Sequence, residues 1–416
     1  MNAKPGAAKF PAAPTWSQRL TSVGVTGTNG KTSTTSFLAA ILHEFAPPVP
    51  RTTTLGLFLG EQEQLDLQRS YTGFLELMQR GLEQGATLAV LEVTSEVLGR
   101  GFAQAWPFTV GVFTNLSHDH LDAHHSVEHY FASKAQLFLH LTAGGTAVLN
   151  GADEVAPLLA EVTPAQVRQL RYGVASRGAA QLPLDVRAEK VEVSWQGTRA
   201  RLEALTDAGR ALNLPEQLEV GAIGEIFIEN ALAALLAACA LGVPATRAAA
   251  ALKLQGAPRG RFEVVHTAPH VVIDYAHTPD ALQRTLSTAR GLCAGQLWVI
   301  FGAGGNRDKQ KRPEMGRAAA GADHVVLTTD NPRDESPQAI AAQIAAGLMA
   351  AAPDREPPRT QLDRALAIAE TLAAAGPQDC ILIAGKGHEG GIERQGSLSG
   401  LGDHALVDAA LAALSR

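Results

Sequence analysis

The chain has 416 residues, of which 46% are hydrophobic and 18% charged, with a formal net charge of −6 and a mean hydropathy of +0.02. This composition predicts a globular chain of two or three domains and excludes a largely disordered one. A pI near 6.1 and the lack of a basic block argue against a protein built mainly to bind nucleic acid. The longest apolar runs are well short of the about 20 residues that span a bilayer, so we expect no membrane segment.

The N-terminal segment and the cysteines bear on localisation. Residues 1–22 are rich in alanine and proline and have no long apolar core followed by a cleavage site, so we expect a mobile lead-in without a signal peptide. The three cysteines, Cys239, Cys293 and Cys380, show no Cys-X-X-Cys spacing, which excludes a disulfide framework and a cysteine-based structural zinc site. We therefore expect a cytoplasmic protein.

From residue 23 onward, short apolar runs alternate with helical stretches, as is typical of an α/β layered domain. Strands are predicted at 23–25, 88–93 and 110–113, and helices at 31–45, 75–83, 127–141, 229–241 and 245–254. The pattern at 185–205 predicts instead a hairpin that turns at 195–198, and hence a small antiparallel element.

A segment that combines glycine, proline and charge, at 255–260, is the best candidate for a linker. Beyond it we predict strands at 271–275, 297–302, 324–328 and 380–384, and helices at 279–289, 314–320, 337–352, 364–375 and 403–414. The predicted fold is therefore α/β. A central domain at 23–255 has a parallel sheet with a small antiparallel element, and a smaller Rossmann-like α/β domain follows at 256–416.

Residues 24–33, GVTGTNGKTS, lie between a predicted strand and a predicted helix. Glycines at 27 and 30 let the backbone turn tightly, so that its N–H groups and the helix N-terminus can surround a polyphosphate. Lys31 supplies a cation for the β- and γ-phosphate oxygens, and Thr32 supplies a hydroxyl for Mg²⁺. The usual pattern has Gly where this chain has Val25, which indicates a particular subclass of phosphate loop. The competing interpretation is a Gly-rich turn without a ligand.

The loop makes the central domain a P-loop-type ATPase domain. The loop residues predicted to bind ATP are Gly27, Thr28, Asn29, Gly30, Lys31, Thr32 and Ser33. Glu92 ends a predicted strand, where a carboxylate can hold a hydrated Mg²⁺ beside the phosphates. His120 lies just past another strand, although four further histidines nearby favour a solvated polar cluster as the alternative. Lys134 lies on a predicted helix, where an exposed surface lysine is the commoner interpretation.

Motifs along nearly the whole chain from residue 23 resemble the Mur ligase family, and most closely its diaminopimelate-adding branch, MurE. The matching stretches in the first part are GVTGTNGKTST (24–34), LEVTSE (91–96), TNLSHDHLD (114–122), YFASKAQLF (130–138) and ENALAA (229–234). Those in the second part are GRFEVV (260–265), DYAHTPDAL (274–282), FGAGGNRDKQKRPEMG (301–316), TTDNPRDESP (328–337) and AGKGHE (384–389). The resemblance implies ATP-dependent amide formation, in which a carboxylate is phosphorylated and an amine then displaces phosphate.

The resemblance also implies roles for single residues. The catalytic residues would be Lys31, Glu92, His120 and Lys134, and the Mg²⁺ ligands would be Thr32, Glu92, His120 and a Lys134 carbamylated by CO₂. A desolvated amine reacts with CO₂ in its neutral form, which fits an apolar neighbourhood. The residues placed near the nucleoside or phosphates of ATP are Asn230, Arg261, Asp274 and His277. For Arg261 and Asp274, an interdomain salt bridge is the alternative.

A motif in the second domain, Asp330-Asn331-Pro332-Arg333, matches the diaminopimelate-selecting motif of the family. Arg333 suits a bidentate contact with a carboxylate, and Asp330 and Asn331 offer acceptors for an ammonium. Further positions of that pocket match Arg307, Gly385 and Glu389. The alternative is a charged turn that caps the next helix, which would explain Asp and Pro but not Arg307 and Glu389.

The acceptor side departs from the family. Only 23 residues precede Gly24, too few for a folded UDP-binding domain. Ser70-Tyr71-Thr72-Gly73 stands where a TTP motif is usual, and Thr94-Ser95-Glu96 stands in place of Ser-Ser-His. We therefore expect a MurE-like ligase that joins diaminopimelate, or a similar amino acid, to a carboxylate without the UDP-sugar handle.

Several alternatives stay open. One is the standard UDP-MurNAc-tripeptide synthetase reaction of MurE, with the UDP end bound by a partner protein or left in solvent. Another is an amide ligase of secondary metabolism related to cyanophycin synthetases. A non-catalytic ATP-binding module is disfavoured by the set of catalytic residues, and a folylpolyglutamate-type ligase by the DNPR motif.

Overall fold

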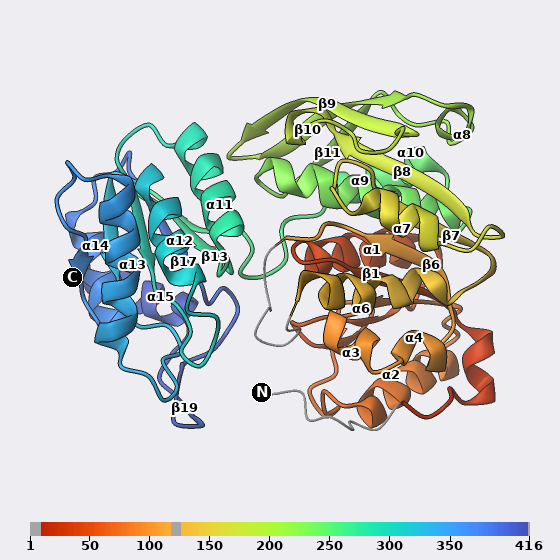
Figure 1. Cartoon of the computed structure of the whole chain (residues 1–416), viewed down its shortest axis with the longest axis horizontal. Coiled ribbons are helices and arrows are strands. Elements are labelled where there is room, and N and C mark those ends of the chain that lie inside the picture. Colours follow the sequence, from red (N-terminus) through yellow and green to blue (C-terminus); the bar gives the residue numbers. More distant parts are fainter. Residues whose placement is uncertain (1–9, 118–125, 415–416) are drawn as a thin grey trace. The chain divides into compact units, whose positions relative to one another are not determined.

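The computed structural model describes residues 10–117 and 126–414 and has an α/β fold, as the sequence predicts (Figure 1). The chain divides into two compact units, Met1–Gly256 and Ala257–Arg416. Each unit has its own sheet and its own helices, and each is described separately below. Within the described ranges, no helix is long and apolar enough to cross a membrane.

The first unit is built on a sheet whose strands, among the described residues, follow the order β11-β10-β9-β8-β7-β6-β1-β5-β2-β3-β4. Its strands are β1 (Thr21–Thr26), β2 (Pro50–Thr52), β3 (Leu57–Leu59), β4 (Gln62–Glu63), β5 (Leu88–Glu92), β6 (Phe108–Phe113), β7 (Leu141–Asn150), β8 (Arg168–Val174), β9 (Val186–Ser194), β10 (Gly197–Ala204) and β11 (Gln217–Val220). Neighbours from β2 to β9 in this order pair in parallel, whereas β3, β4, β10 and β11 add antiparallel strands at the two ends. The predicted hairpin is β9 and β10, and β7 and β8 were not predicted.

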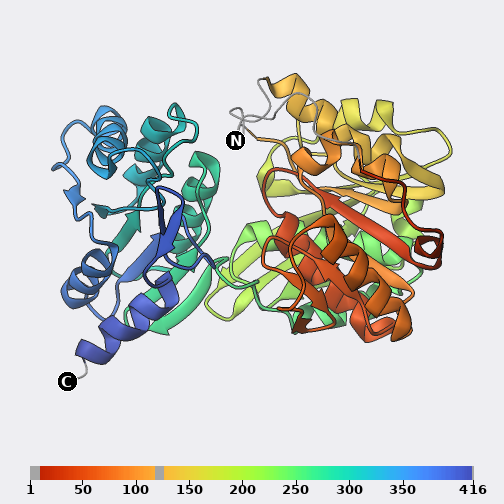
Figure 2. The same ribbon diagram turned by 90° about the horizontal axis from the view of Figure 1, so that it is seen from below.

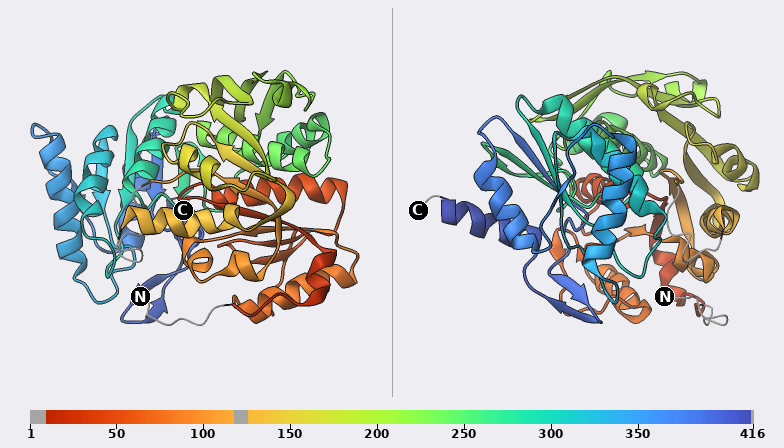
Figure 3. Two further views of the ribbon diagram at one scale, coloured as in Figure 1. Left: turned by 45° about the vertical axis from the view of Figure 1, so that its right-hand side comes forward. Right: turned by 60° about the vertical axis from the view of Figure 1, so that its left-hand side comes forward.

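Helices cover both faces of this sheet, as the further views in Figures 2 and 3 show. They are η1 (Thr15–Arg19), α1 (Lys31–Phe45), α2 (Tyr71–Glu83), α3 (Ser95–Gly99), α4 (Phe102–Ala105), α6 (Val127–Leu139), α7 (Ala156–Val162), η2 (Ala175–Arg177), α8 (Asp207–Arg210), α9 (Glu225–Ala240) and α10 (Ala245–Lys253). A Cβ at Gly24 of β1 would come within 2.8 Å of Leu137 of α6, so α6 packs closely on that face. Val23 and Val25 point to the opposite face and are fully buried. The strand is therefore enclosed on both sides, as parallel strands usually are.

Two segments of the first unit differ from the expectation. The mobile lead-in predicted at 1–22 is ordered from Phe10, whose ring lies 5.2 Å from the rings of Tyr71 and Phe102. Residues 1–9 lie outside the described ranges. The helix predicted at 75–83 begins at Tyr71, because Ser70 accepts a hydrogen bond from the backbone N–H of Gly73 at 3.2 Å and so caps the helix.

The second unit has a sheet whose described strands follow the order β12-β13-β17-β14-β15-β16, and a separate hairpin of β18 and β19. The strands are β12 (Glu263–Thr267), β13 (His270–Asp274), β14 (Leu297–Phe301), β15 (His324–Leu327), β16 (Arg359–Thr360), β17 (Cys380–Ala384), β18 (Ile392–Arg394) and β19 (Ser397–Ser399). The helices are α11 (Pro279–Leu292), α12 (Lys311–Ala318), η3 (Ala319–Gly321), α13 (Pro337–Ala351), α14 (Arg364–Ala374) and α15 (Asp403–Leu414).

Apart from β12, the strands of the six-stranded sheet are parallel, and β17 is buried at every position. Asp274 at the end of β13 pairs in register with Ala384 at the end of β17. The polar segments that follow β13, β14, β15 and β17 therefore leave the sheet at the same edge. In open α/β sheets this carboxyl edge is where ligands bind.

Candidate active site

The phosphate loop joins β1 to α1 and requires glycine at two positions. Gly27 has φ +153° and Gly30 has φ +84°, in the region that disfavours other residues. A Cβ at Gly27 would fall 1.9 Å from Oγ1 of Thr114, and one at Gly30 would fall 2.3 Å from Oδ1 of Asn230. The loop is therefore compact for steric as well as conformational reasons.

Two lysines converge on one carbonyl oxygen of this loop. Lys31 Nζ donates to the Gly27 carbonyl at 3.0 Å and to the Thr28 carbonyl at 2.8 Å. Lys134 Nζ, from α6, donates to the same Gly27 carbonyl at 2.7 Å and lies 4.3 Å from the centre of the Tyr130 ring. Lys134 is only 1% exposed, so the alternative of a surface lysine is wrong. Both lysine side chains therefore lie at the loop, where they could also donate to a bound anion.

A hydroxyl and a carboxylate meet at the first turn of α1. Thr32 Oγ1 donates to Glu92 Oε2 at 2.9 Å, and the backbone N–H of Thr54 donates to the same oxygen at 3.0 Å. Glu92 reaches this place because it ends β5, which pairs with β1 so that Glu92 lies opposite Val25. Oxygen donors of this kind are the ligands that Mg²⁺ prefers, so Thr32 and Glu92 fit the ion.

The described part of the chain does not show His120 or Lys134 as metal ligands. In residues 10–117 and 126–414, no group of three His, Cys, Asp or Glu side chains could hold a metal ion. His120 lies outside the described residues, so its role as a ligand stays a prediction. Lys134 donates to the loop carbonyl as an amine, and its carbamate also stays a prediction.

Residues that the motif analysis did not single out hold the loop in place. The backbone N–H of Asn29 donates to Asn115 Oδ1 at 2.9 Å, and Thr114 Oγ1 donates to the Asn29 carbonyl at 2.6 Å. Thr28 Oγ1 lies 3.2 Å from the hydroxyl of Tyr130. Thr114 and Asn115 begin the TNLSHDHLD stretch directly after β6, which is the signal that could have identified them.

Asn230 on α9 contacts the loop from the other side. Its side chain is 1% exposed and faces Gly30, and among the described residues its Oδ1 has no hydrogen-bond partner. Buried polar atoms are rarely left without partners, so this oxygen fits a ligand bound at the loop. The neighbouring Glu229 is occupied, with Arg177 Nε at 3.0 Å. Burial raises the pKa of Glu229, and Arg177 opposes that rise.

The other predicted nucleotide contacts lie in the second unit around Tyr275. The guanidinium carbon of Arg261 lies 4.1 Å from the centre of the Tyr275 ring, and the ring of His277 lies 4.6 Å from it. Asp274 is buried, and its carboxylate accepts from the backbone N–H of Phe262 at 2.6 Å and from that of Ala276 at 2.7 Å. Burial raises the pKa of Asp274, and the bond from Phe262 opposes that rise.

Asp274 was expected to accept ribose hydroxyls. In the structure, each of its carboxylate oxygens accepts a hydrogen bond from a backbone N–H of the second unit. Asp274 therefore stabilises the turn after β13. Arg261 and Asp274 both belong to the second unit, where Arg261 stacks on an aromatic ring.

The DNPR turn after β15 lies against the segment after β17. Asn331 Nδ2 donates to Glu389 Oε2 at 3.0 Å. Asn331 Oδ1 accepts from Lys386 Nζ at 3.0 Å and from the backbone N–H of Glu393 at 2.9 Å. A carbonyl oxygen has two lone pairs, and both are used here. In this structure the Asn331 oxygen therefore accepts from Lys386 and from the backbone of Glu393, and its side-chain nitrogen donates to Glu389, while a contact of Asn331 with a substrate ammonium stays a prediction.

The arginines of the predicted pocket lie beside the same turn. Arg333 has φ +51°, and its Nε pairs with Glu393 Oε2 at 3.0 Å while its Nη1 donates to the Gly305 carbonyl at 2.8 Å. A Cβ at Gly304 would lie 3.1 Å from Arg333 Nη1 and 3.5 Å from Arg307 Cγ, so both arginines flank Gly304. Their positive charges favour an anionic group such as a carboxylate.

Asp330 and Gly385 complete the set. Asp330 Oδ1 accepts from the backbone N–H of Asn331 at 2.5 Å. Gly385 has φ +106°, and a Cβ there would lie 2.7 Å from Asp330 Oδ2, so only glycine lets the segment after β17 approach so closely. The residues predicted for the amine pocket, Arg307, Asp330, Asn331, Arg333, Gly385 and Glu389, therefore gather at one edge of the second sheet.

A buried ion pair contacts the end of β17 at this edge of the second sheet. Arg364 on α14 binds Asp403 through Nε at 2.6 Å and Nη2 at 2.8 Å, and Nη2 also donates to the Ala384 carbonyl at 3.2 Å. Burial lowers the pKa of Arg364, but the charge and hydrogen bonds of Asp403, together with the charges of Asp330 and Glu389, outweigh it, so that the net direction is upward. Neither residue was predicted, since nothing in the sequence distinguishes them from surface charges on two helices.

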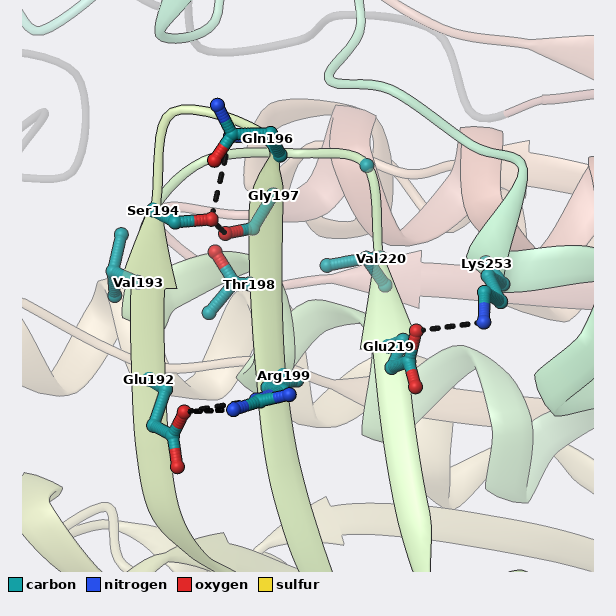
Figure 4. A pocket seen from close by; sticks show the side chains of 11 residues that line it. Glu192, Val193, Ser194, Gln196, Gly197, Thr198, Arg199, Glu219, Val220 and Lys253 are labelled. Atoms are coloured by element: carbon teal, nitrogen blue, oxygen red, sulfur yellow. Dashed lines mark hydrogen bonds and ion pairs between the residues drawn. The ribbon is translucent and has the colours of Figure 1, made fainter.

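A surface hollow of about 440 Å³ lies over β9, β10 and β11, and none of its lining residues was predicted for the site (Figure 4). Its charged side chains are mutually paired, Arg199 with Glu192 at 2.5 Å and Lys253 with Glu219 at 2.9 Å. It offers no unbalanced charge to a ligand, and we assign it no role.

Two family models of the Mur ligases match most of the chain. The Mur ligase middle domain model matches residues 25–238, and the "Mur ligase, glutamate ligase domain" model matches residues 260–387. A UDP-N-acetylmuramoyl-L-alanyl-D-glutamate–2,6-diaminopimelate ligase from Thermosynechococcus vestitus is 38% identical over 388 residues, which are 90% of this chain and 73% of the relative. One of the same name from Gloeobacter violaceus is 37% identical over 91% of this chain and 74% of the relative. A solved structure with that ligase name has a TM-score of 0.64 at 33% identity and covers 95% of this chain and 79% of its own.

Proposed function

This chain belongs to the Mur ligase family of ATP-dependent amide ligases, and we propose that it joins diaminopimelate to the terminal carboxylate of UDP-N-acetylmuramoyl-L-alanyl-D-glutamate. The observation that carries the choice of amine is the contact of Asn331 with Glu389 at 3.0 Å, beside Arg333 and Arg307. This contact supports the proposal because it places carboxylates that suit an ammonium beside guanidiniums that suit a carboxylate. The distal end of diaminopimelate carries both groups.

The proposed reaction has two steps. An oxygen of the acceptor carboxylate attacks the γ-phosphorus of ATP and ADP leaves, which yields an acyl phosphate. The amine then attacks the acyl carbon, loses a proton and expels phosphate. Lys31 and the N-terminus of α1 stabilise the phosphate oxygens, and the loop backbone positions them.

The metal part of the proposal rests on two described residues. Thr32 and Glu92 would hold Mg²⁺, which supplies positive charge to the phosphates when bound. Lys134 would add a carbamate, formed when its amine attacks CO₂ and releases a proton. Its burial beside Gly27 supports this role, because burial favours the neutral amine. His120 is proposed as a further ligand from the resemblance alone.

The names of the relatives favour the UDP-linked acceptor over the expected acceptor without a UDP-sugar handle. Two observations support the second candidate. Glu96 is an exposed carboxylate on α3, close in sequence to Glu92, and negative charge there disfavours an anionic acceptor. The Tyr71 ring is used in packing against Phe10, which leaves it little freedom to serve a ligand.

The deciding experiment measures ADP release by the purified full chain with ATP, Mg²⁺ and diaminopimelate. One arm supplies UDP-N-acetylmuramoyl-L-alanyl-D-glutamate and another supplies L-alanyl-D-glutamate and related peptides without the nucleotide. Mass spectrometry identifies the ligated product. Product in the first arm supports the proposal, whereas product only in the second arm supports the alternative acceptor. Release of ADP without any product in either arm would contradict both.

A further inference from the structure

Lys386 is a buried cation that the reaction above does not use. It follows β17 in the AGKGHE stretch, is 1% exposed, and places Nζ 3.0 Å from Asn331 Oδ1 and 3.7 Å from Glu389 Oε2. Asn331 Nδ2 lies 3.0 Å from the same Glu389 oxygen. The three side chains therefore form a closed triangle of donor, amide and carboxylate.

The backbone around Lys386 leaves it little freedom to move away. Gly385 N–H donates to the Asp274 carbonyl at 3.1 Å, and the backbone N–H of Glu389 donates to the Lys386 carbonyl at 2.9 Å. Gly387 has φ +54°, and a Cβ there would lie 2.7 Å from the Gly260 carbonyl. The turn that carries Lys386 is thus held from both sides by its own unit.

The amide of Asn331 has two orientations that differ only by exchange of its oxygen and nitrogen. Lys386 has only donors and Glu389, when ionised, only acceptors. The orientation with the oxygen toward Lys386 and the nitrogen toward Glu389 satisfies all three side chains. The flipped orientation would place two donors together at Lys386 and two acceptors together at Glu389. The backbone N–H of Glu393 favours the same orientation, since it also donates to Oδ1.

We propose that Lys386 is a positioning residue of the amine pocket, which keeps Asn331 as a donor and holds Glu389 in place as the acceptor for the distal ammonium of the amine substrate. The inference rests on the proposed function of this pocket. Lys386 acts through Asn331 and Glu389 and does not itself touch the substrate. The three carboxylates of the pocket, Asp330, Glu389 and Glu393, are balanced by three cations, Lys386, Arg307 and Arg333. The pocket therefore suits a head group that carries one charge of each sign.

The test compares two amines that differ only in the distal ammonium, meso-diaminopimelate and 2-aminopimelate. In Lys386→Met we expect the KM for diaminopimelate to rise about 10- to 100-fold, the size of one lost hydrogen bond to a charged group, with the KM for ATP unchanged. The preference for diaminopimelate over 2-aminopimelate should fall by a similar factor. Lys386→Gln, which keeps one donor for Asn331, should lie in between.

Lys253→Met is the matched control, because Lys253 is an exposed lysine in an ion pair with Glu219 at 2.9 Å, outside the pocket. It should leave both KM values and the preference unchanged. A double-mutant cycle with Asn331→Ala adds a second readout. Because Lys386 acts in part through Asn331, Lys386→Gln should raise the KM for diaminopimelate by a smaller factor once Asn331 is alanine than it does in the wild type.

The outcomes distinguish failure of the proposed function from failure of the inference about Lys386. If the wild-type chain does not use diaminopimelate with any acceptor, the proposed function fails and this inference fails with it. If the wild type uses it but the Lys386 variants raise the KM for both amines equally, Lys386 is only structural and the inference alone is overturned. The inference is also overturned if Lys386→Gln and Asn331→Ala raise the KM for diaminopimelate independently, so that their factors multiply in the double variant. The cycle uses Lys386→Gln in case Lys386→Met does not fold.

Discussion

Thr32 and Glu92 are joined by a hydrogen bond of 2.9 Å across 60 residues of sequence, from the first turn of α1 to the end of β5. The contact exists because β1 and β5 are parallel neighbours whose carboxyl ends stop at the same level. It brings a hydroxyl and a carboxylate together beside the phosphate loop, at the place where Mg²⁺ would be needed.

Glu92→Gln tests this pair. The amide oxygen can still accept from Thr32, so the fold should be kept, but the negative charge for the metal is lost. We expect turnover to fall by about 10²- to 10³-fold and the Mg²⁺ concentration for half-maximal activity to rise. ADP release measured over a magnesium titration, with thermal melting as the folding control, checks this. Unchanged magnesium dependence would contradict the assignment.

Lys31→Ala should reduce ATP turnover by about 10²- to 10³-fold while the protein remains folded, because this lysine acts on phosphate charge and not on packing. ADP release and circular dichroism are the measurements. Lys253→Ala, an exposed lysine of the same unit, serves as the control and should retain activity. Normal turnover in folded Lys31→Ala would remove the phosphate-loop assignment.

Lys134→Ala should be inactive and partly rescued by formate or acetate, whose oxygens can replace those of a carbamate. The measurement is ADP release with and without the added carboxylate, together with the intact mass of the wild type in bicarbonate. Activity equal to the wild type would refute the carbamate. A rescue by chloride as strong as by formate would show that any anion between Lys31 and the loop suffices.

Arg333→Ala should weaken the amine more than ATP, since the guanidinium lies at the amine pocket with Nε 3.0 Å from Glu393. We expect the KM for diaminopimelate to rise about 10- to 100-fold and the KM for ATP to stay within about twofold. Arg333→Lys keeps the charge but not the planar fork and should recover only part of the loss. Equal effects on both substrates would point to a general disruption of the second unit.

The loop before Arg307 is anchored by Glu335, whose pKa is lowered to about 2 by its hydrogen bonds with the buried Arg312, at 2.9 and 3.0 Å. A carboxyl with a lowered folded-state pKa stabilises the fold fully above its ordinary pKa of 4.5, and this stability is lost as the pH falls toward 2.

Glu335→Gln should therefore destabilise the protein at pH 7, by about 1–3 kcal/mol, because it leaves Arg312 without a charged partner. The difference from the wild type should shrink between pH 4.5 and pH 2. Urea unfolding at several pH values measures it. A difference that is independent of pH would show that the charge of Glu335 is not what matters.

The order of strands and helices in the second unit could be largely predicted from the sequence, because apolar runs and helical periodicity are local properties. The start of α2 and the strands β7 and β8 were not predicted, for different reasons. Ser70 caps α2, so that the helix begins at Tyr71, four residues before the predicted start, and β7 contains two glycines and polar residues in its first half.

The sequence by itself determined where the strand, the Gly-rich loop and the helix that begins at Lys31 lie, since this motif is contiguous and depends on spacing along the chain. Only the tertiary structure decided which atoms face one another. Lys134 meets the Gly27 carbonyl across 107 residues, and the polarity of Asn331 depends on Lys386, 55 residues away. Such contacts arise from the order of strands in a sheet and from the burial of specific atoms, and the competition among donors for one oxygen is settled only when the chain has folded.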